Sequence, residues 1–277
     1  MKVTMLGSGT SSGVPRIGNQ WGACDPTEPK NRRRRVSVLV EAGVHKLIID
    51  TGPDFREQCL SAGLLRLDAV LLTHSHADHT HGIDDIRQVM HLMGAPIPVH
   101  AAKGTWDHLY ARFDYLFEGR SLYSQSAVAH TIDGPFEVGP MSILAFPQVH
   151  GPITSWGFRI EADGKSIVFS GDVADISELH PLLGGADLVL METGHHKVED
   201  VCAYLRDSDL APGELGFIHH GRAILADPDG ELGLELGQLV HDVRSSRSYR
   251  PAGQSVQLVR DDVSCLPAGH SVHLVDI

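Results

Sequence analysis

Three histidines and one aspartate stand within six residues of one another, at positions 74, 76, 78 and 79. They follow the apolar run 67–72, which has the length and composition of a buried strand. Side chains on one face of a helix are three or four residues apart, so His74 and His76 can point the same way only from a tight loop. We expect Asp78 and His79 to turn toward a second point close by. Imidazole and carboxylate groups together suit zinc, iron or manganese rather than calcium or magnesium.

Further residues of these types follow other expected strands. A histidine or aspartate comes at the end of four later strands, namely His150, Asp172, His195 and His219, with His220 beside the last. Layered α/β structures build their sites from residues at strand ends on one edge. This supply argues against the alternative interpretation of segment 74–79 as a histidine-rich surface loop. Two ligand pairs side by side indicate two metal ions.

The hydrophobic pattern predicts strands and helices in alternation along the chain. The expected strands are 2–7, 36–41, 46–50, 67–72, 97–101, 141–149, 165–170, 186–191, 214–218, 254–259 and 271–275. The expected helices are 54–62, 84–93, 105–117, 198–205 and 232–243. The glycine-rich segment 7–15 is not predicted to be a nucleotide P-loop, because no Lys-Ser/Thr pair closes it and no helix pattern follows. No linker, repeat or low-complexity tract divides the chain, so we expect one domain over residues 1–277.

Composition bounds the class of protein. The chain has 277 residues, 42% of them hydrophobic, with a formal net charge of -12, so it lacks the overall basic footprint of a nucleic-acid-binding protein. It contains no apolar run long enough to predict a membrane span. The four cysteines (24, 59, 202 and 265) form no C-x-x-C pair, which is typical of a reducing compartment. No secretory signal pattern begins the chain, so the simplest prediction is a cytoplasmic enzyme.

Four consecutive arginines, residues 32–35, precede the expected strand 36–41. One interpretation is a solvated turn that balances charge. The other is an anion site for a phosphate-bearing substrate, in which Arg34 and Arg35 are the candidates because they lie nearest the strand. A guanidinium offers a rigid fork that matches phosphate oxygens. The sequence leaves both interpretations open.

With these residues laid out, the chain resembles the metallo-β-lactamase superfamily over nearly its whole length. Residues 74–79 match the family pattern H-x-H-x-D-H, and residues 6–15 and 79–87 resemble one branch, the phosphodiesterases that act on phosphoribosyl 1,2-cyclic phosphate. The resemblance implies an α/β fold, an αββα sandwich of two mixed β-sheets face to face with helices outside. Some relatives in this branch hold a structural zinc through several cysteines in the loop after the N-terminal glycines. Here that loop keeps Cys24 alone, so we expect that zinc site to be absent.

The resemblance also implies how the ligands divide between two divalent ions, for which zinc, manganese and iron are all suitable. The first ion would be bound by His74, His76 and His150, and the second by Asp78, His79 and His219, with Asp172 bridging them. His219 is preferred because it is the first residue past its strand, and His220 is the alternative. We expect Asp50 to accept the free N–H of a ligand histidine, although an aspartate at this position can also simply cap a turn.

In such two-metal sites the ions lower the pKa of a shared water to near neutrality. The resemblance implies that the resulting hydroxide attacks phosphorus, that Asp78 orients it, and that His195 protonates the leaving oxygen. A histidine suits the last task because its pKa lies near the working pH. The alternative for His195 and His196 is a pair at a helix start with no chemical role.

The function predicted from the sequence is therefore a dinuclear-metal-dependent hydrolase, a phosphodiesterase for a small, cyclic phosphate ester. One alternative keeps the site and changes the substrate to a thioester or lactone. Another is a non-catalytic protein that binds a metabolite through its metals. Cleavage of transfer RNA at its 3′ end is disfavoured, because we expect such an enzyme to carry a long Gly/Pro-rich arm and a basic surface. A homodimer is the expected assembly on base rates for soluble enzymes.

Overall fold

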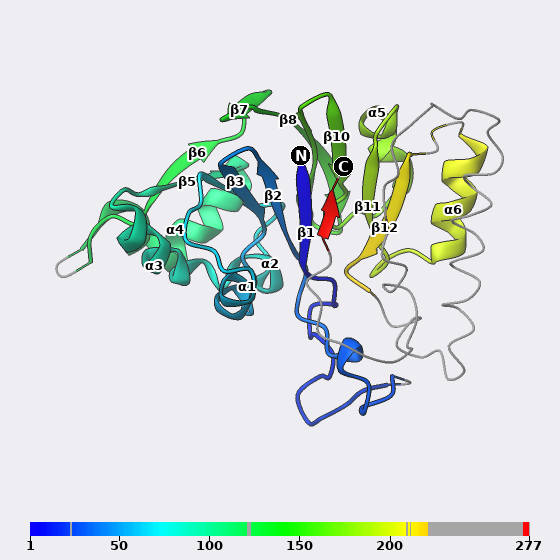
Figure 1. Ribbon diagram of the computed structural model, residues 1–277, viewed down its shortest axis with the longest axis horizontal. Helices are drawn as coiled ribbons and strands as arrows, with labels where there is room; N and C mark the ends of the chain where they lie inside the picture. The colour runs from blue at the N-terminus through cyan, green and yellow to red at the C-terminus, as the bar shows by residue number, and fades with distance from the viewer. Residues whose placement is uncertain (23, 121–122, 209, 211, 221–273, 277) are drawn as a thin grey trace.

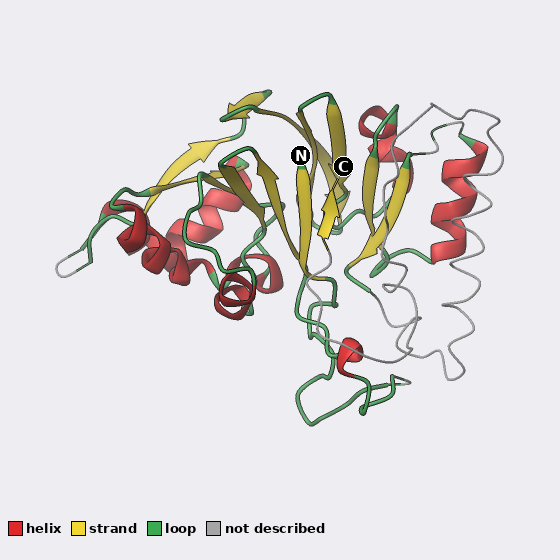
Figure 2. Ribbon diagram, viewed as in Figure 1, coloured by secondary structure: helices red, strands yellow, loops and turns green. Residues whose placement is uncertain are grey.

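The structure is a computed structural model and describes residues 1–22, 24–120, 123–208, 210, 212–220 and 274–276. The expected helix 232–243 and strand 254–259 lie outside these residues. Most of the expected elements are present with ends shifted by one to three residues. Two mixed β-sheets form the centre of the molecule, and helices lie outside them (Figures 1 and 2). The predicted αββα sandwich is confirmed.

The first sheet has seven strands in the order β13-β1-β2-β3-β4-β5-β6. Their bounds are β13 Leu274–Asp276, β1 Lys2–Gly7, β2 Ser37–Ala42, β3 His45–Ile49, β4 Ala69–Leu71, β5 Ile97–Ala101 and β6 Ala127–Thr131. The second sheet has six strands in the order β12-β11-β10-β9-β8-β7. Their bounds are β12 Glu214–Ile218, β11 Leu188–Glu192, β10 Lys165–Phe169, β9 Ile153–Ala162, β8 Met141–His150 and β7 Phe136–Val138.

Helices cover the outer face of each sheet. The α-helices are α1 Phe55–Ser61, α2 Ala77–Thr80, α3 Ile86–Met93, α4 Lys103–Glu118, α5 His180–Leu183 and α6 Val198–Asp207, and 3-10 turns span Pro29–Asn31, Ile83–Asp85 and Ile176–Leu179. One apolar cluster joins α1, α3 and α4 to the first sheet, and another joins α5 and α6 to the second. In the described part of the chain, no helix combines the length and apolar character needed to cross a membrane.

The strands are apolar on both faces because both faces are covered. In β3, Leu47 and Ile49 join the core between the sheets, while Ile48 packs against the outer helices. In β10, Ile167 faces the other sheet and Val168 faces α5 and α6. Successive side chains of a strand point to opposite faces, so a strand between two packed layers reads as a continuous apolar run.

The strand directions explain why the candidate ligands meet at one edge. Strands β10, β11 and β12 run parallel, and β8 runs in the same direction because both β8 and β10 are antiparallel to β9. The carboxyl ends of these four strands therefore lie on one edge of the second sheet. The carboxyl end of β4 in the first sheet leads into segment 74–79.

The glycine-rich segment 7–15 has a packing role in this arrangement. The backbone N–H of Gly9 donates to the carbonyl of Arg34 at 2.8 Å, and Gly9 also bridges to Arg35 and His220. A Cβ at Gly9 would lie 2.9 Å from the Arg34 carbonyl oxygen. A glycine is therefore needed for the close approach of two backbones, and not for a phosphate cradle.

Candidate metal centre

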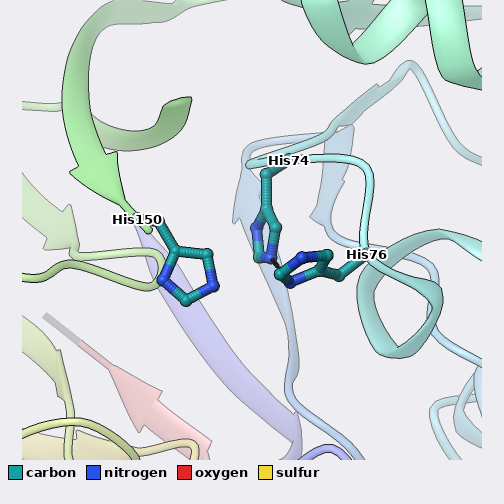
Figure 3. Close-up of side chains that lie close together, drawn as sticks. All are labelled: His74, His76 and His150. Atoms are coloured by element: carbon teal, nitrogen blue, oxygen red, sulfur yellow. Dashed lines mark hydrogen bonds between the residues drawn. The ribbon is translucent and has the colours of Figure 1, made fainter. Parts of the chain in front are cut away.

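The first cluster consists of His74, His76 and His150 (Figure 3). His74 and His76 lie in the loop after β4, and His150 is the last residue of β8. Nε2 of His74 is 3.0 Å from Nδ1 of His76, and the His150 ring centroid is 5.0 Å from each of the other two. One ligand atom from each residue lies within 4.8 Å of the others. The structure therefore brings together the three residues expected to bind the first ion.

The second cluster consists of Asp78, His79 and His219, whose ligand atoms also lie within 4.8 Å of one another. Oδ2 of Asp78 is 3.4 Å from Nε2 of His79 and 3.4 Å from Nε2 of His219. Asp78 and His79 lie in the short helix α2, so the expectation of a loop holds for residues 74–76 and not for these two. The helix begins after His76 and directs Asp78 and His79 toward His219, while the His79 ring stays 4.2 Å from that of His74.

Asp172 lies between the two clusters. Its Oδ2 is 3.9 Å from Nε2 of His74, 3.7 Å from Nε2 of His150 and 3.6 Å from Nε2 of His79. Its Oδ1 is 3.8 Å from Nδ1 of His219. The side chain is buried, and one carboxylate thus faces residues of both clusters. This is the arrangement that a bridging ligand requires.

Charges in the site are arranged to stabilise cations. Burial works against the ionised form of Asp172, but the charges of His79 and His219 hold its pKa well below the usual range. Burial and the neighbouring His79 lower the pKa of His74, so its imidazole stays neutral with a free lone pair. Burial also disfavours the cation of His79, yet Asp172 and Asp50 outweigh it and raise the pKa of His79. The carboxylates that favour a proton on His79 would equally favour a metal ion there.

The residues present fit two divalent ions. Nε2 of His79 and Nδ1 of His219 are buried and have no hydrogen-bond partner among the described residues, and a buried polar atom of this kind is costly unless something binds it. The set of five imidazoles and two carboxylates exceeds what one tetrahedral ion can use. It suits zinc, manganese or iron.

Asp50 orients His79 of the second cluster through the ring nitrogen that faces away from Asp78. The N–H at Nδ1 of His79 donates to Oδ2 of Asp50 at 2.7 Å, and the backbone N–H of Thr73 donates to Oδ1 at 2.8 Å. The Thr73 hydroxyl contacts the same carboxylate at 2.9 Å. A partner at Nδ1 fixes the tautomer and leaves Nε2 for a ligand. Asp50 is thus placed where the sequence analysis expected it to act.

Glu192 was not assigned a role from the sequence, and it positions His195. The N–H at Nδ1 of His195 lies 2.9 Å from Oε1 of Glu192, and the backbone N–H groups of Gly194 and His195 donate to Oε2 at 2.6 and 3.0 Å. Glu192 is fully buried, whereas the His195 side chain is 40% exposed. The hydrogen bond with Glu192 raises the pKa of His195 against the effect of burial. The sequence contained a signal for a role of Glu192, because Glu192 is the last residue of β11, and the other site residues also stand at strand ends.

The imidazole of His195 stands beside both clusters. Its ring centroid is 4.8 Å from that of His150 and 5.9 Å from that of His219. The neighbouring His196 instead lies 2.8 Å from the carbonyl oxygen of Val173 through its Nε2. His195 therefore reaches the centre, and His196 is engaged with the backbone beside it.

His219 and His220 are separated by the backbone conformation. His219 has a left-handed φ of 51°, and its ring reaches Asp78 and Asp172. His220 is buried with Nδ1 3.4 Å from the Thr193 hydroxyl, and it belongs to none of the ligand clusters found in the described residues. The geometry favours His219.

Arg34 and Arg35 contact the region of α1. Nη1 of Arg34 donates to the Glu57 carbonyl and to the Ser61 hydroxyl, both at 2.8 Å. Arg35 pairs with Asp54 at 3.0 Å. Neither makes a hydrogen bond or ion pair with a residue of the clusters, so their role in binding substrate stays a prediction.

Cys24 is buried in a small apolar cluster with Val14 and Trp21. None of the metal-ligand groups formed by described residues includes it. Cys59 and Cys202 are free thiols in this structure.

Comparison with known proteins identifies the family of this chain. The family model described as the β-lactamase superfamily domain matches residues 45–221. The chain belongs to this family. The resemblance noted from the sequence is thereby confirmed for the superfamily.

Individual relatives carry different names. The chain is 35% identical over 184 residues to an octanoyltransferase of Porphyromonas gingivalis, covering 64% of this chain and 36% of that protein, so it spans about a third of that relative's length. It is 28% identical over 232 residues to ribonuclease Z of Mycobacterium bovis, covering 74% of this chain and 77% of that protein. Among solved structures, a diphosphatase from the PhnP family is 28% identical with a TM-score of 0.72, covering 84% of this chain and 91% of the other.

Proposed function

We propose that this protein is a two-metal hydrolase of phosphate esters and that its substrate is a small, cyclic phosphodiester. The observation that carries the proposal is the Asp172 carboxylate, which faces three residues of the first and second clusters within 3.6–3.9 Å through Oδ2. Relatives named ribonuclease Z and diphosphatase support phosphoryl chemistry. The family and the ligand clusters support the coarser statement of a metal-dependent hydrolase.

Bound metal ions would supply Lewis acidity toward the phosphoryl oxygens and lower the pKa of water. The side chains of the protein do the rest. The Asp78 carboxylate accepts a hydrogen bond from the attacking water and so orients it. Because Glu192 holds Nδ1 of His195, the opposite ring nitrogen, Nε2, is the one that can give a proton to the leaving oxygen.

Hydrolysis of a thioester or lactone on the same ligands is the alternative reaction, and a metabolite-binding protein without catalysis is the alternative class. The relative named octanoyltransferase points toward acyl chemistry, although the chain covers only 36% of that protein. The Glu192–His195 pair argues against the binding protein. A buried carboxylate that orients an exposed histidine is what proton transfer requires, and simple binding does not need it.

The test is turnover of bis(p-nitrophenyl) phosphate by protein loaded with zinc or manganese, with parallel assays of a thioester, a lactone, a nucleoside diphosphate ester and a precursor transfer RNA. We expect hydrolysis of the phosphodiester, and its loss in Asp172→Asn. Turnover of the thioester or lactone without any phosphoryl substrate would contradict the proposal. Binding of metals without turnover of any substrate would favour the binding protein.

Two further expectations belong to this proposal. A cytoplasmic enzyme is proposed because the four cysteines of the sequence form no C-x-x-C pair, which is typical of a reducing compartment. A homodimer is proposed on the general frequency of two-fold assemblies. Light scattering of the purified protein tests the second.

A further inference from the structure

A third group of metal-binding side chains stands beside the two clusters. It consists of Glu192, His195 and His219, and one ligand atom from each lies within 4.8 Å of the others. Glu192 is the last residue of β11, and His219 directly follows β12. The two strands are parallel neighbours in which Glu192 pairs with Ile218 (Figure 1). The topology of the second sheet therefore brings this group to the same edge as the metal centre.

The spacing within this group is close to that of the ligands around a tetrahedral ion. Oε1 of Glu192 is 2.9 Å from Nδ1 of His195. Zinc binds nitrogen and carboxylate oxygen at about 2.0–2.2 Å, which separates two ligand atoms of a tetrahedral site by about 3.4 Å. A shift of about half an ångström would thus admit an ion at the point where the N–H of His195 now meets the carboxylate.

His219 offers one ring nitrogen to each side. Its Nε2 is 3.4 Å from Oδ2 of Asp78, in the second cluster. Its Nδ1 lies against the turn that carries His195, since a Cβ on Gly194 would clash with it. Oδ1 of Asp172 is 3.8 Å from this nitrogen, too far for a hydrogen bond. Nδ1 is buried and has no hydrogen-bond partner among the described residues, so it is available as a ligand atom for a further ion.

The group is accessible to an ion from solvent. The side chains of Glu192 and His219 are buried, whereas that of His195 is 40% exposed. Three protein ligands that leave a fourth position for water are typical of an open zinc site rather than a structural one. The carboxylate of Glu192 offsets part of the charge of an incoming cation. Two-metal sites, in which the ions are about 3.5–4 Å apart, show that neighbouring cations tolerate such proximity.

We propose that Glu192, His195 and His219 bind a third zinc ion when zinc is in excess over the two ions of the centre, and that this ion withdraws His195 from proton transfer. Zinc displaces the Nδ1 protons of the two rings to solvent, because ligand nitrogens must be deprotonated. Nδ1 of His195 then carries zinc, so the ring no longer forms the protonated donor that hydrolysis uses. The inhibitory role rests on the proposed function, whereas the binding of the ion does not.

Counting metal ions tests the binding without any assay of turnover. Wild-type protein is dialysed against buffers of rising free zinc, and its metal content is measured by elemental analysis. We expect a plateau at two equivalents, followed by a third at higher zinc. His195→Ala and Glu192→Gln should stop at two. Excess manganese should give two equivalents in the wild type, because divalent manganese binds such ligands more weakly than zinc does.

His196→Ala is the matched control. His196 is the next histidine of the same turn, its Nε2 lies 2.8 Å from the carbonyl oxygen of Val173, and it belongs to none of the metal-binding groups found in the described residues. This variant should bind the third zinc ion as the wild type does.

The proposal is overturned if the wild type stops at two equivalents, or if His195→Ala still binds the third. Failure of the first two ions to bind would instead contradict the proposed function. In that case the difference of one zinc equivalent between the wild type and His195→Ala still decides whether the third site exists.

Kinetics with two leaving groups tests the inhibitory role. Adenosine 2′,3′-cyclic phosphate has an alkoxide leaving group, which needs a proton, whereas the p-nitrophenolate of bis(p-nitrophenyl) phosphate leaves without one. The third zinc equivalent should slow wild-type turnover of the cyclic substrate by about a hundredfold or more, the usual contribution of a general acid. It should spare the p-nitrophenyl ester. Equal inhibition of both substrates, or the same degree of inhibition in His195→Ala, would overturn the inhibitory role.

Discussion

The two ligand clusters differ in what surrounds them. The second has its own carboxylate in Asp78, and its His79 is fully buried with Asp50 behind it. The first is made of imidazoles alone, and the side chain of His76 is exposed. Among the described carboxylates, Asp172 is the one within 4 Å of first-cluster histidines, and the second cluster shares it.

This difference in surrounding carboxylates implies that the two clusters bind their metal ions with unequal affinity. Carboxylates neutralise a divalent ion, and a buried partner that orients a ligand histidine strengthens its binding. We therefore expect the second cluster to bind its ion more tightly and to release it more slowly. The first ion would be the exchangeable one, and substrate would approach from its side.

The largest expected effect comes from Asp172, because it serves both halves. Asp172→Asn should lose both ions and reduce turnover by more than the hundredfold that follows loss of an outer hydrogen-bond partner. Elemental analysis and kinetics measure this. Asp175→Asn, three residues later at an exposed turn where Asp175 accepts from the N–H of Ser177, should bind two ions normally. Two equivalents of metal in Asp172→Asn would contradict a shared ligand.

His76→Ala distinguishes the metal ion of the first cluster from that of the second. It should bind one equivalent of metal instead of two and lose most activity, since it removes a ligand from the first cluster alone. The ion that remains should be the one that the wild type releases last to a chelator. A variant that kept the fast-released ion instead would reverse the order of affinity that we infer.

Asp50→Asn should weaken the second cluster while leaving all its ligands in place. The amide can still accept from the Thr73 N–H, but it no longer offers a charged acceptor to Nδ1 of His79. Affinity for the second ion should fall about ten- to a hundredfold, as measured by competition with a fluorescent chelator. An equal loss at both clusters would mean that Asp50 supports the fold rather than one half-site.

Glu192→Gln should have the smallest effect, since His195 stands beside both clusters without belonging to either expected ligand set. Its hydrogen bond with Glu192 raises the pKa of His195, so the protonated form persists to higher pH and is lost as pH rises through that value. Removing the carboxylate should move the alkaline limb of the kcat profile to lower pH and keep both metals. An unmoved limb, or loss of metal, would show that Glu192 does not act through a proton on His195.

Much of this centre could be predicted from the sequence. Ligand type depends on residue identity, and strand ends can be recognised from where an apolar run stops, as at Leu72 before His74. The αββα architecture followed from the family resemblance, and strands apolar on both faces, such as β3, agree with it. Residue identities and strand ends are local features, so motif spacing and periodicity contain them.

Other features were decided only by the tertiary structure. Neighbouring histidines look alike in a sequence, and the left-handed backbone at His219 turns one of them into the centre. Helix α2, which carries Asp78 and His79, interrupts a segment that looks like a loop. Glu192 could be seen at a strand end, but its pairing with His195 depends on how the following turn folds back.

The arginines show most clearly why the sequence alone does not predict which residues meet in the folded chain. The run at residues 32–35 is conspicuous in the sequence, yet Arg34 and Arg35 contact the region of α1. Arg112 has no motif around it and reaches the ligand loop because α4 packs on that loop 37 residues away in the chain. Residue type and spacing fix which groups can do chemistry, whereas the packing of distant helices and sheets fixes which of them meet.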